Sequence, residues 1–101
     1  MSPEATELTL YGDNEEPIYR QKMVIFRALA KKKDRGVYDP KLAPKAFAAL
    51  LNAAAKRYVR EFGGQGDRWN AMFSPMDRRH AALHYASEFL DWYETDYKTT
   101  K

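Results

Sequence analysis

The chain has 101 residues, a length typical of a single domain, and 45% of them are hydrophobic, which excludes wholesale disorder. It contains no cysteine, so disulfide frameworks, thiolate metal sites and thiol nucleophiles are excluded. The net charge is only +3, and because the chain has neither a membrane-length apolar run nor a secretory-signal pattern, we expect a soluble, cytoplasmic protein without a membrane partner.

Both ends of the chain are predicted to be loose or extended tails. Residues 1–13 contain Pro3 and Gly12 and show only a weak, strand-like alternation of apolar side chains. This segment is expected either to remain a tail or to pack in extended form against the body of the protein. Residues 95–101 are polar and are expected to fray.

The first helix is predicted over residues 14–34. Asn14 can accept hydrogen bonds from the free amide groups of the first turn, and Glu15 and Glu16 suit the positive end of the helix dipole. Apolar side chains then recur at helical spacing on a wide stripe, which indicates contacts with two neighbouring elements. Gly36 is expected to end the helix, because glycine readily adopts the backbone conformation that follows many helix C-termini.

The second helix is predicted over residues 43–62, with Pro44 in its first turn. Its apolar stripe is surrounded by alanines, which favour the helical state and allow neighbouring helices to approach closely, so we expect it to be the central helix. A double glycine at residues 63–64 is expected to end it. The stripe comprises Phe47, Leu50, Leu51, Ala54, Tyr58 and Phe62.

A short helix is predicted over residues 67–73, and a third long helix over residues 75–94, with Ser74 as its cap and Pro75 in its first turn. Because the connections are short, neighbouring helices are expected to be antiparallel. The elements together predict an all-α fold, a compact bundle of three main helices plus one short helix. The whole chain, residues 1–101, is expected to form a single helical domain.

Charged side chains are distributed unevenly along the chain. Residues 1–16 carry five acidic side chains and no basic one, whereas residues 17–38 carry seven basic side chains and one acidic one. Further bases fall near the starts of the second and third long helices, where Arg78 and Arg79 oppose the helix dipole at a small energetic cost. Antiparallel packing would bring the bases either into one stripe or into two patches at opposite ends of the bundle.

The basic middle of the chain supports the leading functional hypothesis. A cluster of bases can contact phosphate groups and gives salt-sensitive binding that depends little on base sequence. The protein is therefore predicted to be a small non-enzymatic helical module that binds nucleic acid or a nucleic-acid-containing assembly. The predicted contacts to phosphate are Lys31, Lys32, Lys33, Arg35, Arg57 and Arg60.

Aromatic side chains in the C-terminal third support an alternative hypothesis. A bundle of this size can bury several of them, but any that remain exposed would mark a protein-binding surface, because Trp and Tyr dominate interface energetics. The alternative is an interaction module, such as an adaptor, an inhibitor or a homodimer. Its predicted contacts are Trp69, Phe73, Trp92, Tyr93 and Tyr97.

The sequence gives weaker evidence for metal binding or catalysis than for a binding surface. Asp77, His80, His84 and Glu88 recur on one face of the third helix at a spacing that could ligate a divalent metal, but such a face is more commonly a solvated one. The glycine-rich residues 63–66 follow a helix and lack the lysine of a phosphate-binding loop. No nucleophile with a neighbouring base can be assigned. We therefore predict no catalytic residue, metal site, cofactor or small-molecule substrate.

Overall fold

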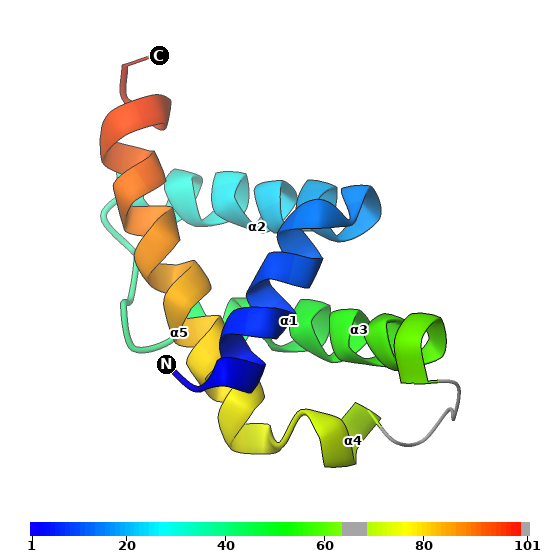
Figure 1. Cartoon of the computed structure of the whole chain (residues 1–101). Coiled ribbons are helices and arrows are strands. Elements are labelled where there is room, and N and C mark those ends of the chain that lie inside the picture. Colours follow the sequence, from blue (N-terminus) through cyan, green and yellow to red (C-terminus); the bar gives the residue numbers. More distant parts are fainter. Residues whose placement is uncertain (64–68, 100–101) are drawn as a thin grey trace.

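The computed structural model describes residues 1–63 and 69–99, and the regular elements within these residues are all helical (Figure 1). The predicted all-α bundle of three main helices and one short helix is confirmed, with one further helix at the N-terminus. No helix in the described ranges combines the length and the apolar character that crossing a bilayer requires. The elements are α1 (Pro3–Asn14), α2 (Glu16–Asp34), η1 (Ala43–Phe47), α3 (Ala48–Tyr58), η2 (Val59–Gly63), α4 (Trp69–Met72), α5 (Pro75–Trp92) and η4 (Tyr93–Tyr97).

Local signals set the ends of the long helices. The predicted helix over residues 43–62 begins as the 3₁₀ turn η1, continues as α3 and ends in the wider π-type turn η2. Ser74 caps α5 as predicted, since its Oγ accepts from the Asp77 amide at 3.1 Å and the Asp77 carboxylate accepts from the Ser74 amide at 3.0 Å. Gly36 follows α2 with a φ of +74°, and its amide donates to the Lys33 carbonyl at 3.1 Å.

The prediction of a loose tail over residues 1–13 is wrong, because this segment forms α1. Ser2 caps the helix by accepting a hydrogen bond from the amide of Ala5 at 3.1 Å, and Pro3 occupies the first helical position. Ala5 and Leu8 are fully buried, and α1 packs against α3 and α5 (Figure 1). The N-terminal helix is therefore part of the core.

The start of α2 also differs from its prediction. Asn14 is the last residue of α1 and does not cap α2. The capping position belongs to Glu15, whose side chain makes no capping hydrogen bond, and α2 begins at Glu16. A single non-helical residue therefore joins α1 to α2 at a sharp corner (Figure 1).

The C-terminal segment is ordered further than predicted, because η4 continues the helix to Tyr97. The hydroxyl of Tyr93 donates to Asp34 Oδ1 at 2.6 Å, and that of Tyr97 donates to Asp34 Oδ2 at 2.9 Å. These hydrogen bonds join the end of the chain to the end of α2. The expected fraying of residues 95–101 is therefore wrong up to Tyr97, and residues 100–101 lie outside the described part of the chain.

Aromatic side chains from α2, η1 and α5 form the centre of the core. The ring centroid of Phe26 lies 5.8 Å from that of Phe47 and 5.6 Å from that of Phe89, in edge-to-face contacts. Tyr85 packs edge-to-face on Phe47 at 5.6 Å. The predicted stripes of the second and third long helices therefore face each other, except that Phe62, expected to be buried, is exposed.

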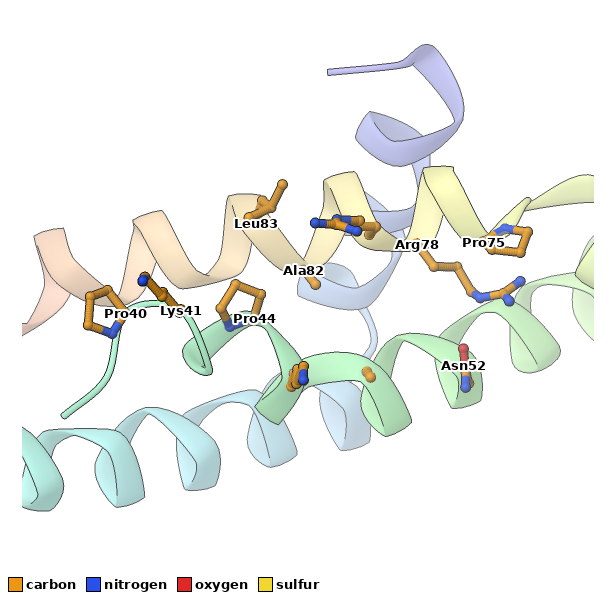
Figure 2. A pocket seen from close by; sticks show the side chains of 11 residues that line it. Pro40, Lys41, Pro44, Asn52, Pro75, Arg78, Ala82 and Leu83 are labelled. Carbon is orange, nitrogen blue, oxygen red and sulfur yellow. The ribbon is translucent and has the colours of Figure 1, made fainter. Parts of the chain in front are cut away.

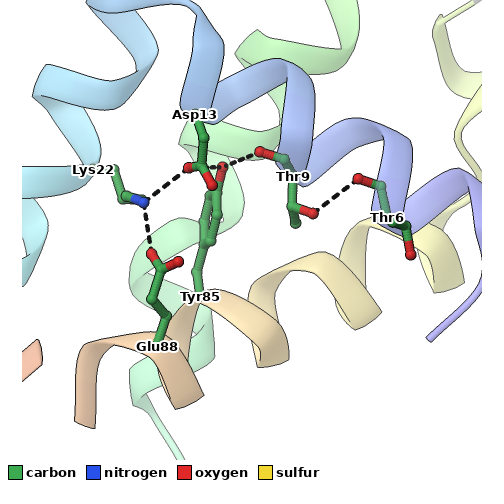
Figure 3. A network of polar contacts seen from close by, with 6 residues as sticks. All are labelled: Thr6, Thr9, Asp13, Lys22, Tyr85 and Glu88. Carbon is green, nitrogen blue, oxygen red and sulfur yellow. Dashed lines mark hydrogen bonds and ion pairs between the residues drawn. The ribbon is translucent and has the colours of Figure 1, made fainter. Parts of the chain in front are cut away.

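A polar network crosses this core and joins α1, α2 and α5 (Figure 3). The Lys22 side chain is only 4% exposed, and its Nζ donates to Asp13 Oδ1 at 2.8 Å and to Glu88 Oε1 at 2.6 Å. The Tyr85 hydroxyl oxygen lies 3.2 Å from both Asp13 Oδ1 and the carbonyl oxygen of Thr9. Burial alone would lower the pKa of Lys22, but the two carboxylates outweigh it and raise this pKa above its ordinary value.

Asp77→Asn is expected to weaken the junction between the starts of α1 and α5. Asp77 Oδ1 accepts a hydrogen bond from Ser2 Oγ at 2.8 Å, in addition to the bond that the carboxylate accepts from the Ser74 amide. Burial alone would raise the pKa of Asp77, but these hydrogen bonds outweigh it and hold the pKa below its ordinary value. The carboxylate therefore stabilises the fold above about pH 4, and this contribution is lost as the pH falls through the lowered pKa.

Urea unfolding at several pH values measures this effect. At pH 7 the Asp77→Asn variant should lose about 1 kcal/mol of unfolding free energy, a value typical of a helix cap. The difference from the wild-type chain should shrink as the pH falls through the lowered pKa of Asp77, because the native carboxylate then becomes protonated. Asp91→Asn, at an exposed aspartate further along α5, is the matched control and should change neither the value nor its pH dependence. Unchanged stability of Asp77→Asn at pH 7 would contradict the prediction.

Candidate functional site

A groove of about 630 Å³ runs between α5 on one side and η1 and α3 on the other (Figure 2). Pro40 and Pro44 line the η1 side, and Pro75, the first residue of α5, lines the far end. Because proline fixes the backbone φ angle, these walls are rigid. Ala48 and Ala82 contribute small side chains that leave the space between the helices open.

Four cationic side chains line this groove, Lys41 and Lys45 near η1 and Arg78 and Arg79 on α5. No carboxylate among the described residues lines it. Arg78 projects from α5 into the groove (Figure 2), and its Nη1 donates to the Phe73 carbonyl at 2.6 Å, which fixes the guanidinium. Positive charge held between apolar walls attracts anions more strongly than the same charge on an open surface.

The basic last turn of α2 lies at the Pro40 end of the groove. Lys33 Nζ lies 5.3 Å from the ring centroids of both Tyr38 and Tyr93, and Tyr38 precedes Pro40 by two residues. The Lys33 ammonium is therefore held over two aromatic rings. The exposed bases beside it are Lys31, Lys32 and Arg35.

Like the four predicted phosphate contacts at the end of α2, Arg57 and Arg60 lie outside the groove lining. Arg57 Nε donates to Glu15 Oε1 at 3.3 Å, at the corner between α1 and α2. Hydrogen bonds from Tyr11 and Arg57 hold the pKa of Glu15 below its ordinary value, so the carboxylate stays charged and neutralises Arg57. Arg60 is exposed in η2. None of the six predicted phosphate contacts is among the described residues that line the groove, and Arg57 forms a separate ion pair.

The aromatic side chains of the alternative hypothesis belong largely to the core. Phe73 and Tyr93 are buried, so the prediction that they form a protein-binding surface is wrong. Trp92 and Tyr97 are half-buried and pack on each other, with ring centroids 5.4 Å apart. Trp69 begins α4, and its side chain lies outside the described part of the structure. The rings of Phe73 and Tyr93 stabilise the helix packing because each buries a large apolar area.

The two carboxylates considered for metal binding have other partners. Asp77 caps α5 and Glu88 pairs with Lys22, so both carboxylates are engaged. Among the described residues, no group of three or more His, Asp or Glu side chains is placed to hold a metal ion. Residues 64–68 lie outside the described part of the chain. They include most of the glycine-rich residues 63–66 and the start of the short helix predicted over residues 67–73.

The four bases of the groove lie near helix starts that the sequence shows clearly, yet the sequence does not show that they meet. Their meeting depends on the packing of η1 against α5, which is a long-range contact. The signal that pointed to them is the pair Arg78 and Arg79, which oppose the dipole of α5.

Comparisons with protein-family models, with curated proteins and with solved structures give no match to this chain.

Proposed function

We propose that the protein is a non-enzymatic module of the cytoplasm that binds the phosphate backbone of nucleic acid in the groove between η1 and α5. The supporting observation is that Lys41 and Lys45, just before and in η1, line the same groove as Arg78 and Arg79 on α5. Each cation that neutralises a phosphate releases a condensed counterion, so the groove should bind nucleic acid most strongly at low salt.

The layout of the charges favours a polyanion over a small anion. Exposed bases lie at the end of α2, outside the groove lining but along the path from Pro40 through Tyr38 to Lys33. A chain of phosphates presents repeated negative charge along such a path. No aromatic side chain among the described residues lines the groove, so bases cannot stack there and the contacts fall on phosphate and sugar. Binding is therefore proposed to depend little on base sequence.

Replacing both Lys41 and Lys45 with Gln is expected to weaken binding of a fluorescein-labelled DNA duplex of about 20 base pairs by about tenfold or more. Fluorescence anisotropy at about 50 to 200 mM NaCl gives the slope of log affinity against log salt concentration. Each lost phosphate contact removes about 0.9 from that slope, so the double variant should lose nearly two units. The matched control replaces Arg27 and Arg60, two exposed bases outside the groove lining, with Gln.

Three outcomes would count against the proposal. Equal losses for the two double variants would show that binding follows the net charge and not the groove. No binding at about 50 mM salt, where phosphate contacts are strong, would remove the proposed function. Tight binding of an acidic amphipathic peptide without any binding of nucleic acid would assign the cations and the apolar Leu83 to a protein partner instead.

A further inference from the structure

The outer face of α5 carries a line of exposed apolar side chains that the core does not use. Met76, Leu83 and Leu90 are 58%, 48% and 38% exposed and follow one another at intervals of seven residues. Seven residues bring an α-helix back to nearly the same face, as in the contact seam of a coiled coil. The opposite stripe of α5, which includes Tyr85 and Phe89, is buried in the core. The line of Met76, Leu83 and Leu90 is therefore left exposed in a single chain.

Charges on this face make it complementary to itself. Arg79 lies four residues before Leu83 on α5, so the two side chains are neighbours on the helix surface. Glu94 lies four residues after Leu90, in the π-type turn η4 that continues α5. The two leucines and the two charges are symmetric about the point between residues 86 and 87. An antiparallel copy of α5 would therefore bring Leu83 against Leu90 twice and Arg79 against Glu94 twice.

Small side chains occupy the point where the two helices would cross. Ser87, which is exposed, and Ala86, which is buried against the core, lie at the centre of the symmetric pattern. Small residues at a crossing point let helix axes approach to about 8 Å, which allows flanking leucines to interdigitate. Glu94 has a partner within the chain, Lys98 at 3.4 Å, but both side chains are more than half exposed, so this ion pair contributes little.

We propose that two copies of the chain associate through antiparallel pairing of α5, with the twofold axis between Ala86 and Ser87. The interface is isologous, because the same face of each copy is used. The apolar seam supplies the burial, and the Arg79–Glu94 pairs select the antiparallel orientation. This association needs no nucleic acid. Arg79 and Leu83 line the groove as well as the seam, whereas Lys41 and Lys45, whose replacement tests the groove, lie outside the seam.

Sedimentation velocity of the full-length chain, at about 5 to 500 µM, tests the seam. The wild-type chain should show a concentration-dependent dimer. Leu83→Glu and Leu90→Glu should each raise the dissociation constant by about 100-fold or more, because each buries a carboxylate twice in an apolar seam. Val24→Glu, at an exposed apolar position on α2, is the matched control and should leave the constant unchanged. Far-UV circular dichroism checks that every variant remains helical.

Charge reversal then tests the pairing. Arg79→Glu and Glu94→Arg each create two like-charge contacts in the dimer, so each should raise the dissociation constant by about tenfold or more. An equimolar mixture of the two variants restores both opposite-charge contacts in the heterodimer and should associate as tightly as the wild type. A wild-type chain that is monomeric at about 500 µM, a dimer that survives both leucine substitutions, or a mixture that gains no affinity would each overturn the proposal.

Discussion

A chain lacking residues 1–13 is expected to lose cooperative folding altogether. α1 buries Ala5 and Leu8 completely, packs against both α3 and α5, and supplies Asp13 to the buried network around Lys22. Burial of one leucine-sized side chain contributes about 1.5–3 kcal/mol, and the truncation also removes hydrogen bonds to α5. Because a whole domain is stabilised by only about 5–15 kcal/mol, the loss of one packed helix is comparable to the total.

Circular dichroism melting curves of the full chain and of residues 14–101 measure this effect. The full chain should melt in one sharp transition and the truncated chain in a broad, non-cooperative one. Leu8→Ala is a milder change that should cost about 2–5 kcal/mol of unfolding free energy. Leu10→Ala, at an exposed position on the same helix, is its control and should stay within about 0.5 kcal/mol of the wild type. A sharp transition of the truncated chain at an unchanged Tm would show that α1 is dispensable.

The N-terminal helix α1, which was not predicted, has the same start signal as α5, which was predicted. The Ser-Pro pair at residues 74–75 predicted the start of α5, and the Ser-Pro pair at residues 2–3 begins α1 in the same way. Gly12 obscured this signal, because glycine near a chain end suggests a loop. In the structure Gly12 permits close packing, since a Cβ atom there would lie 2.6 Å from the Tyr85 hydroxyl.

Features set by neighbours in the sequence were predictable, whereas the candidate site depends on contacts between distant segments. The cap at Ser74 and the stop at Gly36 rest on local hydrogen bonds, and both predictions are confirmed. Arg57 was predicted to contact phosphate, but in the folded chain it donates a hydrogen bond to Glu15, which lies 42 residues earlier in the sequence. The sequence pattern likewise does not distinguish a buried aromatic side chain such as Tyr93 from an exposed one, because both can occur at the same helical spacing.

Lys22→Met is expected to lower the free energy of unfolding by about 2–4 kcal/mol at pH 7. Methionine keeps the length of the side chain but leaves Asp13 and Glu88 without the ammonium group that lies between them (Figure 3). Removing one partner of a fully buried ion pair costs about 3–5 kcal/mol. The lower range is expected here because the two carboxylate side chains are 32% and 34% exposed. The variant also loses the contact of Lys22 Nζ with the Tyr85 ring, 5.0 Å away.

The pH dependence separates this electrostatic loss from a packing defect. In the wild type, the raised pKa of Lys22 means that its contribution is complete below its ordinary pKa of 10.5 and is lost as the pH rises through the raised value. In the variant, Asp13 and Glu88 repel each other, so the folded chain binds protons more readily than the unfolded chain. The difference from the wild type should therefore shrink as the pH falls from 7 to about 4, whereas a packing defect would keep it constant.

Neutralising one carboxylate tests the same cause from the other side of the network. In the Lys22→Met background, Glu88→Gln removes the repulsion between the two carboxylates and should recover about half of the lost stability. In the wild-type background, Glu88→Gln should destabilise the fold, because it weakens an ion pair that the native chain has. Urea unfolding of the four chains forms a double-mutant cycle, and its coupling free energy should exceed about 1 kcal/mol. Additive effects would show that the methylene groups of Lys22, and not its charge, stabilise the junction of α1, α2 and α5.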